Sequence, residues 1–348
     1  MDQTASSGRV AAVAIGRNEG ARLLACLDSL ARQVSRVVYV DSGSTDGSRE
    51  AAAMRGAIVE TLDMSRPFTA ARARNAGVAR LLSECDAVGE PAPEFIQFID
   101  GDCIMDPDWI ATARAFMIDR PVAAVACGRL RERFPEASIY NRMCNREWDT
   151  PVGLAKACGG IAMMRLSAFE AAGGFDPRLI AGEEPELCLR MRTVGWEIHR
   201  IDAEMALHDA DMHHFGQWWT RMRRAGYAWA EGAAIHGATP ERYNVSGLMR
   251  AVVWGIALPT FVLAMAALIH PAFLALGLAW PLQVVRLARR GGWGRDAWET
   301  AIFFTLGKFA EAQGVLRYVF ARLLRRPATI IEYRASKKAG DGLEVARK

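Results

Sequence analysis

The stretch FIQFIDGD, residues 95–102, places a short apolar run directly before two carboxylates that flank a glycine. Upstream, residues 10–15, 37–40 and 57–60 form similar short apolar runs, and segments with helical periodicity separate them. Strands of four to six residues that alternate with helices are typical of βαβ units and of a mostly parallel sheet. The sequence therefore predicts an α/β fold with flanking helices.

Polar clusters follow three of these predicted strands, at residues 17–19, 41–47 and 100–102. In parallel sheets, ligands bind beyond the carboxyl ends of the strands, which is where these clusters are expected. Asp100 and Asp102 offer the oxygen ligands that a hard divalent cation prefers. An ordinary turn after the strand would explain the same three residues, Asp-Gly-Asp, without a metal.

Residues 41–48 read DSGSTDGS, and Asp41 and Asp46 stand in this loop together with hydroxyls and free backbone amides. Such groups could hold a ribose and a base, and a helix N-cap at Thr45 or Asp46 would account for part of the pattern. No G-x-G-x-x-G follows the first strand and no P-loop motif occurs, which argues against dinucleotide-binding and P-loop proteins.

Two further charged positions stand at predicted helix starts. Arg74, in ARARN (residues 71–75), could reach a diphosphate, or it could belong to a solvated helix face. Glu183 and Glu184 precede a predicted helix over residues 185–194, whose first position suits Pro185. Carboxylates are favourable at a helix N-terminus, and one of these could also accept a proton from an attacking hydroxyl.

The amino-acid composition favours a globular protein without a disulfide framework. With 51% hydrophobic and 24% charged residues, the 348-residue chain can bury a large core. Its seven cysteines never form C-x-x-C, which predicts neither a disulfide framework nor a thiolate zinc site. No secretory signal is recognised at the start of the sequence, and a reducing, cytoplasmic setting is expected.

The charges are unevenly distributed. Residues 286–348 hold 14 Lys and Arg against 6 Asp and Glu, whereas the rest of the chain is mildly acidic. A nucleic-acid-binding domain would carry its basic residues on the folded body, so no nucleic-acid partner is expected. The basic tail, residues 331–348, instead suits anionic lipid headgroups.

Residues 251–285 contain no Asp, Glu, Lys or Arg, a run too long for one membrane helix of about 20 residues. His270-Pro271 divides it, so we expect a transmembrane or re-entrant hairpin, with a buried core hairpin as the alternative. Arginines at both ends, Arg250 and Arg286, place both ends on the cytoplasmic face of the inner membrane. Residues 298–320 carry scattered charges and are expected to form an amphipathic interfacial helix.

Taken together, these segments resemble glycosyltransferase family 2, whose nucleotide-diphospho-sugar transferases have the Rossmann-like GT-A fold. The resemblance covers about residues 10–205. It rests on five motifs that occur in the family's order: AIGRNE (14–19), VDSGSTDG (40–47), ARN (73–75), IDGD (99–102) and GEE (182–184) with Glu186, Leu187 and Arg190. The implied organisation is a flexible start (1–8), a catalytic domain (9–240), a membrane-associated helical module (245–330) and the basic tail.

The resemblance also implies roles for individual residues. Donor-binding positions would be Asn18, Glu19, Asp41, Asp46, Arg74 and Asp100. Asp102, with Asp100, would bind Mn²⁺ or Mg²⁺, and His208 could be a further metal ligand or a hydrogen-bonded loop histidine. The catalytic base falls in the Glu183-Glu184 pair. The family usually has Glu-Asp there, and we expect Glu184 to act because it occupies the position of the Asp.

The acceptor side is predicted from Gly159 and Gly160, which allow close backbone approach, and from Trp218, Trp219 and Arg221, which a membrane-interface belt would explain equally well. The Q-x-x-R-W element of processive synthases is absent, which favours a single addition. The expected protein is a metal-dependent, inverting transferase that moves a sugar from a nucleotide-diphospho-sugar to a lipid-linked or membrane-proximal acceptor. A nucleotidyltransferase and a non-catalytic nucleotide-sugar-binding membrane protein are the alternatives.

Overall fold

A computed structural model describes residues 9–325 of the chain, so the predicted flexible start and the basic tail lie outside the described residues. Within this range the chain forms two compact units. The α/β unit comprises residues 9–137 and 144–211, and the helical unit comprises residues 138–143 and 212–325. The division between the units falls at residues 211–212, ahead of the predicted domain boundary near residue 240, because the helix that begins at Phe215 packs along the last helix of the helical unit.

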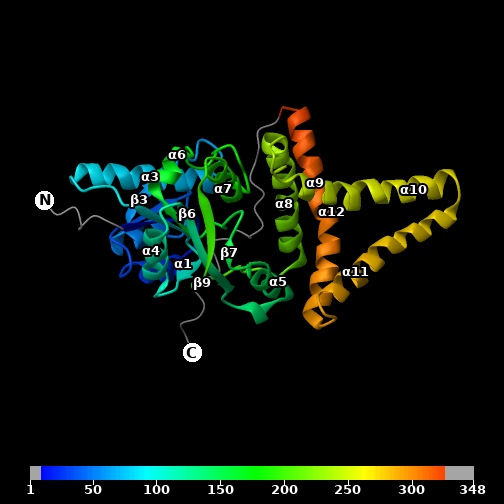
Figure 1. Ribbon diagram of the computed structural model, residues 1–348, viewed down its shortest axis with the longest axis horizontal. Coiled ribbons are helices and arrows are strands. Elements are labelled where there is room, and N and C mark those ends of the chain that lie inside the picture. The colour runs from blue at the N-terminus through cyan, green and yellow to red at the C-terminus, as the bar shows by residue number, and fades with distance from the viewer. Residues whose placement is uncertain (1–8, 326–348) are drawn as a thin grey trace. The chain divides into compact units, whose positions relative to one another are not determined.

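A nine-stranded sheet forms the centre of the α/β unit, in the order β3-β2-β1-β4-β8-β6-β9-β5, with β7 also paired to β9 (Figure 1). Strands β1, β2, β3, β4, β6 and β9 run in one direction, so the sheet is mostly parallel, and β5, β7 and β8 run against them. The strands are β1 Val10–Gly16, β2 Val37–Asp41, β3 Ile58–Thr61, β4 Phe95–Asp100, β5 Cys103–Met105, β6 Ala123–Glu132, β7 Gly153–Leu154, β8 Ala162–Arg165 and β9 Glu197–His208.

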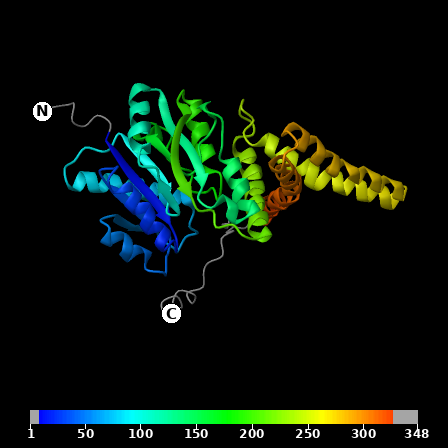
Figure 2. The ribbon, with the colours of Figure 1, turned by 90° about the horizontal axis from the view of Figure 1, so that it is seen from below.

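Helices surround this sheet (Figure 2). They are α1 Ala21–Leu30, α2 Ser48–Met54, α3 Ala70–Ala87, α4 Trp109–Asp119, the short η2 Pro135–Ala137, α5 Ile139–Glu147, α6 Leu166–Ala171 and α7 Glu183–Thr193. Helix α3 packs on β1 and β2, where Gly77 lets the backbones approach, because a Cβ there would overlap Val13 Cγ1. Helix α4 packs on β6 and β9 through the fully buried Trp109, whose indole donates to Gln97 Oε1 at 2.8 Å.

The helix that carries the glutamate pair begins earlier than the sequence predicts. Helix α7 starts at Glu183, so Pro185 is its third residue rather than its first. Gly182 occupies the N-cap with a φ of 79°, a left-handed conformation that glycine adopts without strain. This turn brings both glutamates into the first turn of α7, where the helix dipole favours negative charge.

The helical unit contains α8 Phe215–His236, α9 Val245–Val252, the π-helical turn η3 Val253–Ala257, α10 Leu258–Leu268, η4 Pro271–Leu278, α11 Ala279–Arg290 and α12 Arg295–Leu323. Two of its segments, Val245–Leu268 and Pro271–Arg290, are long and apolar enough to cross a membrane by length and composition. They are separated at residues 269–270, so the apolar run is divided where the sequence predicts.

The amphipathic helix expected at residues 298–320 is in fact a central element of the helical unit. Helix α12 packs against α8, α9 and α11. Its charged residues Lys308 and Glu311 are buried and form an ion pair at 2.7 Å, so they do not face headgroups. Two opposite charges at i and i+3 can neutralise each other inside a bundle, and the interfacial placement of this helix stays a prediction.

Candidate functional site

The two aspartates of IDGD serve different clusters. Strand β4 ends at Asp100 and β5 begins at Cys103, and the Gly101 amide donates to Ile15 O of β1 at 2.8 Å. Asp100 Oδ1 accepts from Arg74 Nη2 at 2.9 Å, whereas Asp102 Oδ2 lies 3.6 Å from His208 Nε2. The triplet therefore contributes one carboxylate to each of two neighbouring groups of side chains.

The first group, here called the Arg74 cluster, consists of Arg74, Asp100, Glu183 and Glu184. Arg74 is 2% exposed, and its Nη1 donates to Glu183 Oε1 at 2.9 Å and to Glu184 Oε1 at 2.8 Å. One buried guanidinium thus faces three carboxylates, from strand β4 and from the first turn of α7. Both Nη atoms of Arg74 contact these carboxylates, and its contact with a diphosphate stays a prediction.

This excess of negative charge acts on Glu184. Burial and, next, the Glu183 carboxylate raise its pKa to about 7, against the lowering effect of Arg74. The Glu184 side chain is 14% exposed and the Glu183 side chain 4%, so Glu184 is the more accessible of the two. A carboxylate whose pKa lies near neutrality suits proton transfer at physiological pH.

Gly160 lies against the same cluster. A Cβ at this position would overlap Arg74 Nη2 and would lie 3.0 Å from Asp100 Oδ2 and 3.1 Å from Glu184 Oε1. The neighbouring Gly159 differs, because a Cβ there would meet no atom within 4 Å. The two glycines that the sequence singles out for the acceptor side are therefore not equivalent, and only Gly160 contacts the cluster.

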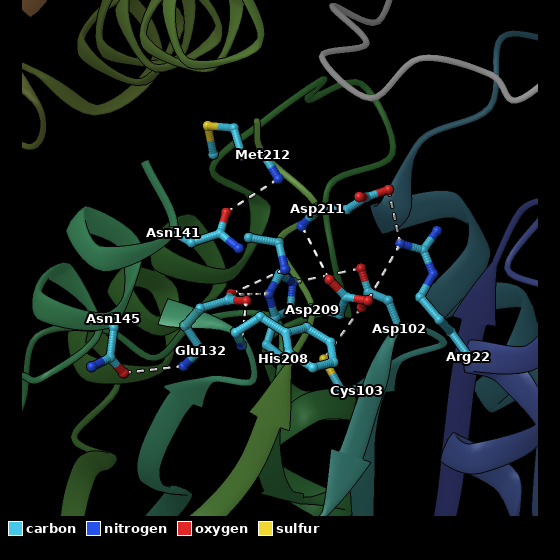
Figure 3. A network of polar contacts seen from close by, with 12 residues as sticks. Arg22, Asp102, Cys103, Glu132, Asn141, Asn145, His208, Asp209, Asp211 and Met212 are labelled. Atoms are coloured by element: carbon cyan, nitrogen blue, oxygen red, sulfur yellow. Dashed lines mark hydrogen bonds and ion pairs between the residues drawn. The ribbon is translucent and has the colours of Figure 1, made fainter. Parts of the chain in front are cut away.

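The second group, the His208 cluster, consists of Asp102, Cys103 and His208, whose ligand atoms lie within 4.8 Å of one another (Figure 3). Strands β5 and β9 pair antiparallel with Cys103 opposite His208, and this register brings the histidine next to Asp102. Asp100 is not a member of this group, and its carboxylate faces Arg74; its role as a metal ligand stays a prediction.

The donor set of this cluster fits a hard divalent cation. Burial and the Asp102 carboxylate raise the pKa of the Cys103 thiol well above its usual range, and a sulfur donor suits a hard cation less well than oxygen does. Asp102 and His208 then offer one oxygen and one nitrogen donor, which leaves further coordination positions for a substrate.

Asp41 builds the loop that follows β2. It is fully buried, and its Oδ2 accepts from the amides of Gly43 at 3.0 Å and Ser44 at 2.9 Å. The Tyr39 hydroxyl donates to its other oxygen at 3.2 Å. The carboxylate expected beside a nucleotide is therefore used to shape the loop.

Asn18 joins this loop to the end of β1. The Asn18 side-chain oxygen, Oδ1, accepts from the backbone amide of Thr45 at 2.8 Å, and the backbone amide of Asn18 donates to Ser44 Oγ at 2.9 Å. Asp46 Oδ1 accepts from the amide and hydroxyl of Ser48, the first residue of α2. The N-cap of α2 is Gly47, which corrects the alternative placement of the cap at Thr45 or Asp46.

Glu19 forms an ion pair with Arg22 at 2.8 Å across the start of α1. It follows Asn18 at the carboxyl end of β1, so Asn18, Glu19 and Asp46 all lie on loops that follow the parallel strands β1 and β2. This is the edge of the sheet at which the sequence predicts donor binding.

The predicted acceptor residues of α8 belong to the helical unit. Trp218 is 2% exposed and packs against Phe303 and Phe215, so the structure gives it a core position. The Trp219 indole donates to Gln313 Oε1 at 2.9 Å. Arg221 lies two residues further along the same helix, and its acceptor role stays a prediction.

Sequence reasoning missed one buried carboxylate near the metal donors. Glu132 ends β6 and lies opposite His208 in the parallel β6–β9 pair. A single acidic residue at the end of an apolar strand is the same signal that identified Asp41 and Asp100. The sequence does not predict residues 123–132 as one long strand, so it does not single out Glu132 as an acidic residue at a strand end.

Comparison with known proteins agrees with this architecture. Residues 13–171 match the model of the family described as glycosyl transferase family 2. The chain is 24% identical over 314 residues to the succinoglycan biosynthesis protein ExoA of Rhizobium meliloti (strain 1021), covering 82% of this chain and 93% of that relative. A solved mannosyltransferase, PcManGT from Pyrobaculum calidifontis in complex with GDP-Man and Mn²⁺, superposes with a TM-score of 0.58 at 19% identity, over 88% of this chain and 87% of that one.

Proposed function

The chain is a family 2 glycosyltransferase with the GT-A fold, and from this premise we propose that it transfers one sugar, with inversion, to a lipid-linked or membrane-proximal acceptor. The proposed donor is a nucleotide-diphospho-sugar. The observation that carries the proposal is the Arg74 cluster, which holds a glutamate with a pKa of about 7 beside the carboxyl end of β4.

In the proposed reaction Glu184 is the general base. It accepts the proton of an acceptor hydroxyl as that oxygen forms a bond to the anomeric carbon. The bond from the anomeric carbon to the diphosphate oxygen breaks on the opposite face, and the nucleoside diphosphate leaves with the bonding electrons. A single in-line displacement inverts the configuration and needs no covalent sugar-enzyme intermediate.

Glu183 and Arg74 are proposed to position the base. Glu183 is the more buried carboxylate and fixes one side of the guanidinium, which in turn holds Glu184 Oε1 at 2.8 Å. A base that is already oriented loses little entropy when the acceptor arrives. Gly160 supports the arrangement by leaving room for the guanidinium.

Asp102 and His208 are proposed to hold Mn²⁺ or Mg²⁺, the cations that the oxygen and nitrogen donors fit. When bound, such an ion neutralises charge that develops on a departing diphosphate. Asn18, Glu19 and Asp46 lie on the adjoining loops and are the proposed contacts of the nucleoside.

We further propose that the helical unit anchors the enzyme at a membrane. Only 11% of the apolar window of segment Val245–Leu268 and 6% of that of Pro271–Arg290 is buried inside the protein. Large side chains such as Phe261, Leu263 and Leu282 are half or more exposed, which is costly in water. Arg250 and Arg286 flank the uncharged run 251–285 within these segments. A hairpin with both ends on the cytoplasmic face therefore agrees with the preference of Lys and Arg for that side of the membrane.

The test uses the detergent-solubilised full chain. UDP, GDP and dTDP are added separately, with and without Mn²⁺, and the Tm is measured, because a ligand that binds the native state raises it. One nucleotide should raise the Tm only when Mn²⁺ is present, and Asp102→Ala should abolish that manganese-dependent increase. An equal shift without metal would contradict metal dependence, and no shift with any nucleotide would contradict the proposed donor class.

A further inference from the structure

Three adjacent strands meet around the His208 imidazole. Strand β9 is paired on one side with β5, which places Cys103 opposite His208, and on the other with β6, which places Glu132 opposite His208. Facing positions on neighbouring strands put side chains within contact distance. The proposed metal donor therefore has Asp102 on one side and Glu132 on the other (Figure 3).

The two ring nitrogens face different carboxylates. His208 Nε2 lies 3.6 Å from Asp102 Oδ2, and Nδ1 lies 3.9 Å from Glu132 Oε2. A neutral imidazole keeps its proton on one nitrogen and binds a metal through the other. With a cation held between Asp102 and Nε2, the ring proton has to sit on Nδ1, and the negative charge of Glu132 lies on that side of the ring.

Glu132 itself is rigidly held. Its side chain is fully buried, its Oε1 accepts from the Phe134 amide at 3.1 Å, and its Oε2 accepts from the Ala210 amide at 3.0 Å. Asn145 Oδ1 accepts from the Glu132 amide at 3.1 Å and so fixes the backbone. Donors from the backbone leave the carboxylate little freedom to turn away from the histidine.

An aromatic contact restrains the ring from the side. Trp148 packs edge-on against His208, with ring centroids 4.6 Å apart and an interplanar angle of 76°. Rotation of the imidazole about its Cβ–Cγ bond would disturb this contact. The strand register and the Trp148 contact thus hold the ring so that Nδ1 faces Glu132, at 3.9 Å and beyond hydrogen-bond distance.

We propose that Glu132 is a positioning residue for the metal site, which sets the tautomer and orientation of His208 so that Nε2 can bind a divalent cation together with Asp102. This inference rests on the metal site of the proposed function. Metal-binding histidines commonly pass their second N–H to a carboxylate, and removal of such a partner weakens metal affinity about 10- to 100-fold.

The test is a double-mutant cycle on the full chain in detergent, with Mn²⁺ alone as the probe and the electron paramagnetic resonance signal of free Mn²⁺ as the readout. Glu132→Gln should weaken Mn²⁺ binding about 10- to 100-fold when His208 is present. In a His208→Ala background the same substitution should have almost no further effect, because Glu132 acts through the imidazole. Glu204→Gln is the matched control, since Glu204 lies on the same strand pair and forms an ion pair with the exposed Arg131.

The outcomes separate the inference from the function on which it rests. If wild type binds Mn²⁺ and His208→Ala weakens binding, but Glu132→Gln behaves like Glu204→Gln, then Glu132 has no positioning role. An equal loss from Glu132→Gln in both backgrounds would show that it only supports the surrounding loop, and would also overturn the inference. If wild type does not bind Mn²⁺ at all, the metal site itself is wrong.

Discussion

Each unit of the protein buries an ionic group, and the two groups are built differently. In the helical unit Lys308 faces one carboxylate, that of Glu311, at 2.7 Å, and its ammonium also lies 4.2 Å from the centroid of the Phe304 ring. In the α/β unit Arg74 faces three carboxylates at 2.8 to 2.9 Å. The first group balances one charge with one, and the second leaves an excess of negative charge.

The difference predicts that the Lys308 pair is structural and that the Arg74 cluster takes part in the reaction. A balanced buried pair contributes little net stability, and it is expensive to break because one charge then remains in the interior without compensation. In the Arg74 cluster, burial and then the neighbouring Glu183 carboxylate raise the pKa of Glu184, and perturbed pKa values of this kind are typical of functional sites. We therefore expect changes in the Arg74 cluster to alter activity and changes in the Lys308 pair to alter stability.

The largest effect is expected from Glu184→Gln. This change removes the proton acceptor but keeps the shape of the side chain, so sugar transfer should fall about 10²- to 10⁴-fold. Manganese-dependent nucleotide binding, measured by Tm, should be retained. Glu183→Gln is the comparison variant, and if it abolishes transfer while Glu184→Gln does not, then Glu183 is the base.

Breaking the balanced pair should affect stability instead. Lys308→Met leaves Glu311 buried without its cation, which should cost about 3–5 kcal/mol of unfolding free energy. A fall in the Tm on the order of 10 °C is expected in detergent. The double variant Lys308→Met/Glu311→Leu should recover most of that loss, and an unchanged Tm in the single variant would refute the structural assignment.

The two glycines provide an intermediate test with a built-in control. Gly160→Ala pushes a methyl group into Arg74 Nη2 and displaces the guanidinium from Glu184, so kcat/KM should fall about 10²-fold. Gly159→Ala adds the same methyl group where no atom lies within 4 Å, and it should stay close to wild type. Equal losses in both variants would mean that the loop, and not the Arg74 cluster, is sensitive to the added group.

The smallest effect expected is the pH dependence. Glu184 must be deprotonated to accept a proton, and its pKa is raised to about 7. Below that value kcat/KM should rise about tenfold per pH unit, and above it the profile should level off. A profile already flat between about pH 5.5 and 7 would place the base elsewhere.

Much of the α/β unit could be predicted from local patterns. The strands at residues 10–15, 37–40 and 95–99 can be predicted because short apolar runs end in polar turns. Since the carboxyl ends of parallel strands lie at one edge of a sheet, the sequence also predicts that Asn18, Asp46 and Asp100 lie at that edge. The boundary of the helical unit was missed, because the packing of α8 along α12 depends on residues nearly a hundred positions apart. The burial of Lys308 and Glu311 was missed for the same reason, since their charges suggest a surface.

The sequence by itself determined the alternation of strands and helices, the family motifs and the division of the apolar run at His270-Pro271, because these depend on neighbours along the chain. Only the tertiary structure decided which carboxylate of IDGD faces Arg74 and which faces His208, and that Glu132 lies behind the histidine. Those assignments depend on strand pairing, in which β5 and β6 flank β9, and on the turn that starts α7. Register between distant strands follows from the packing of the whole sheet, which no local stretch of residues specifies.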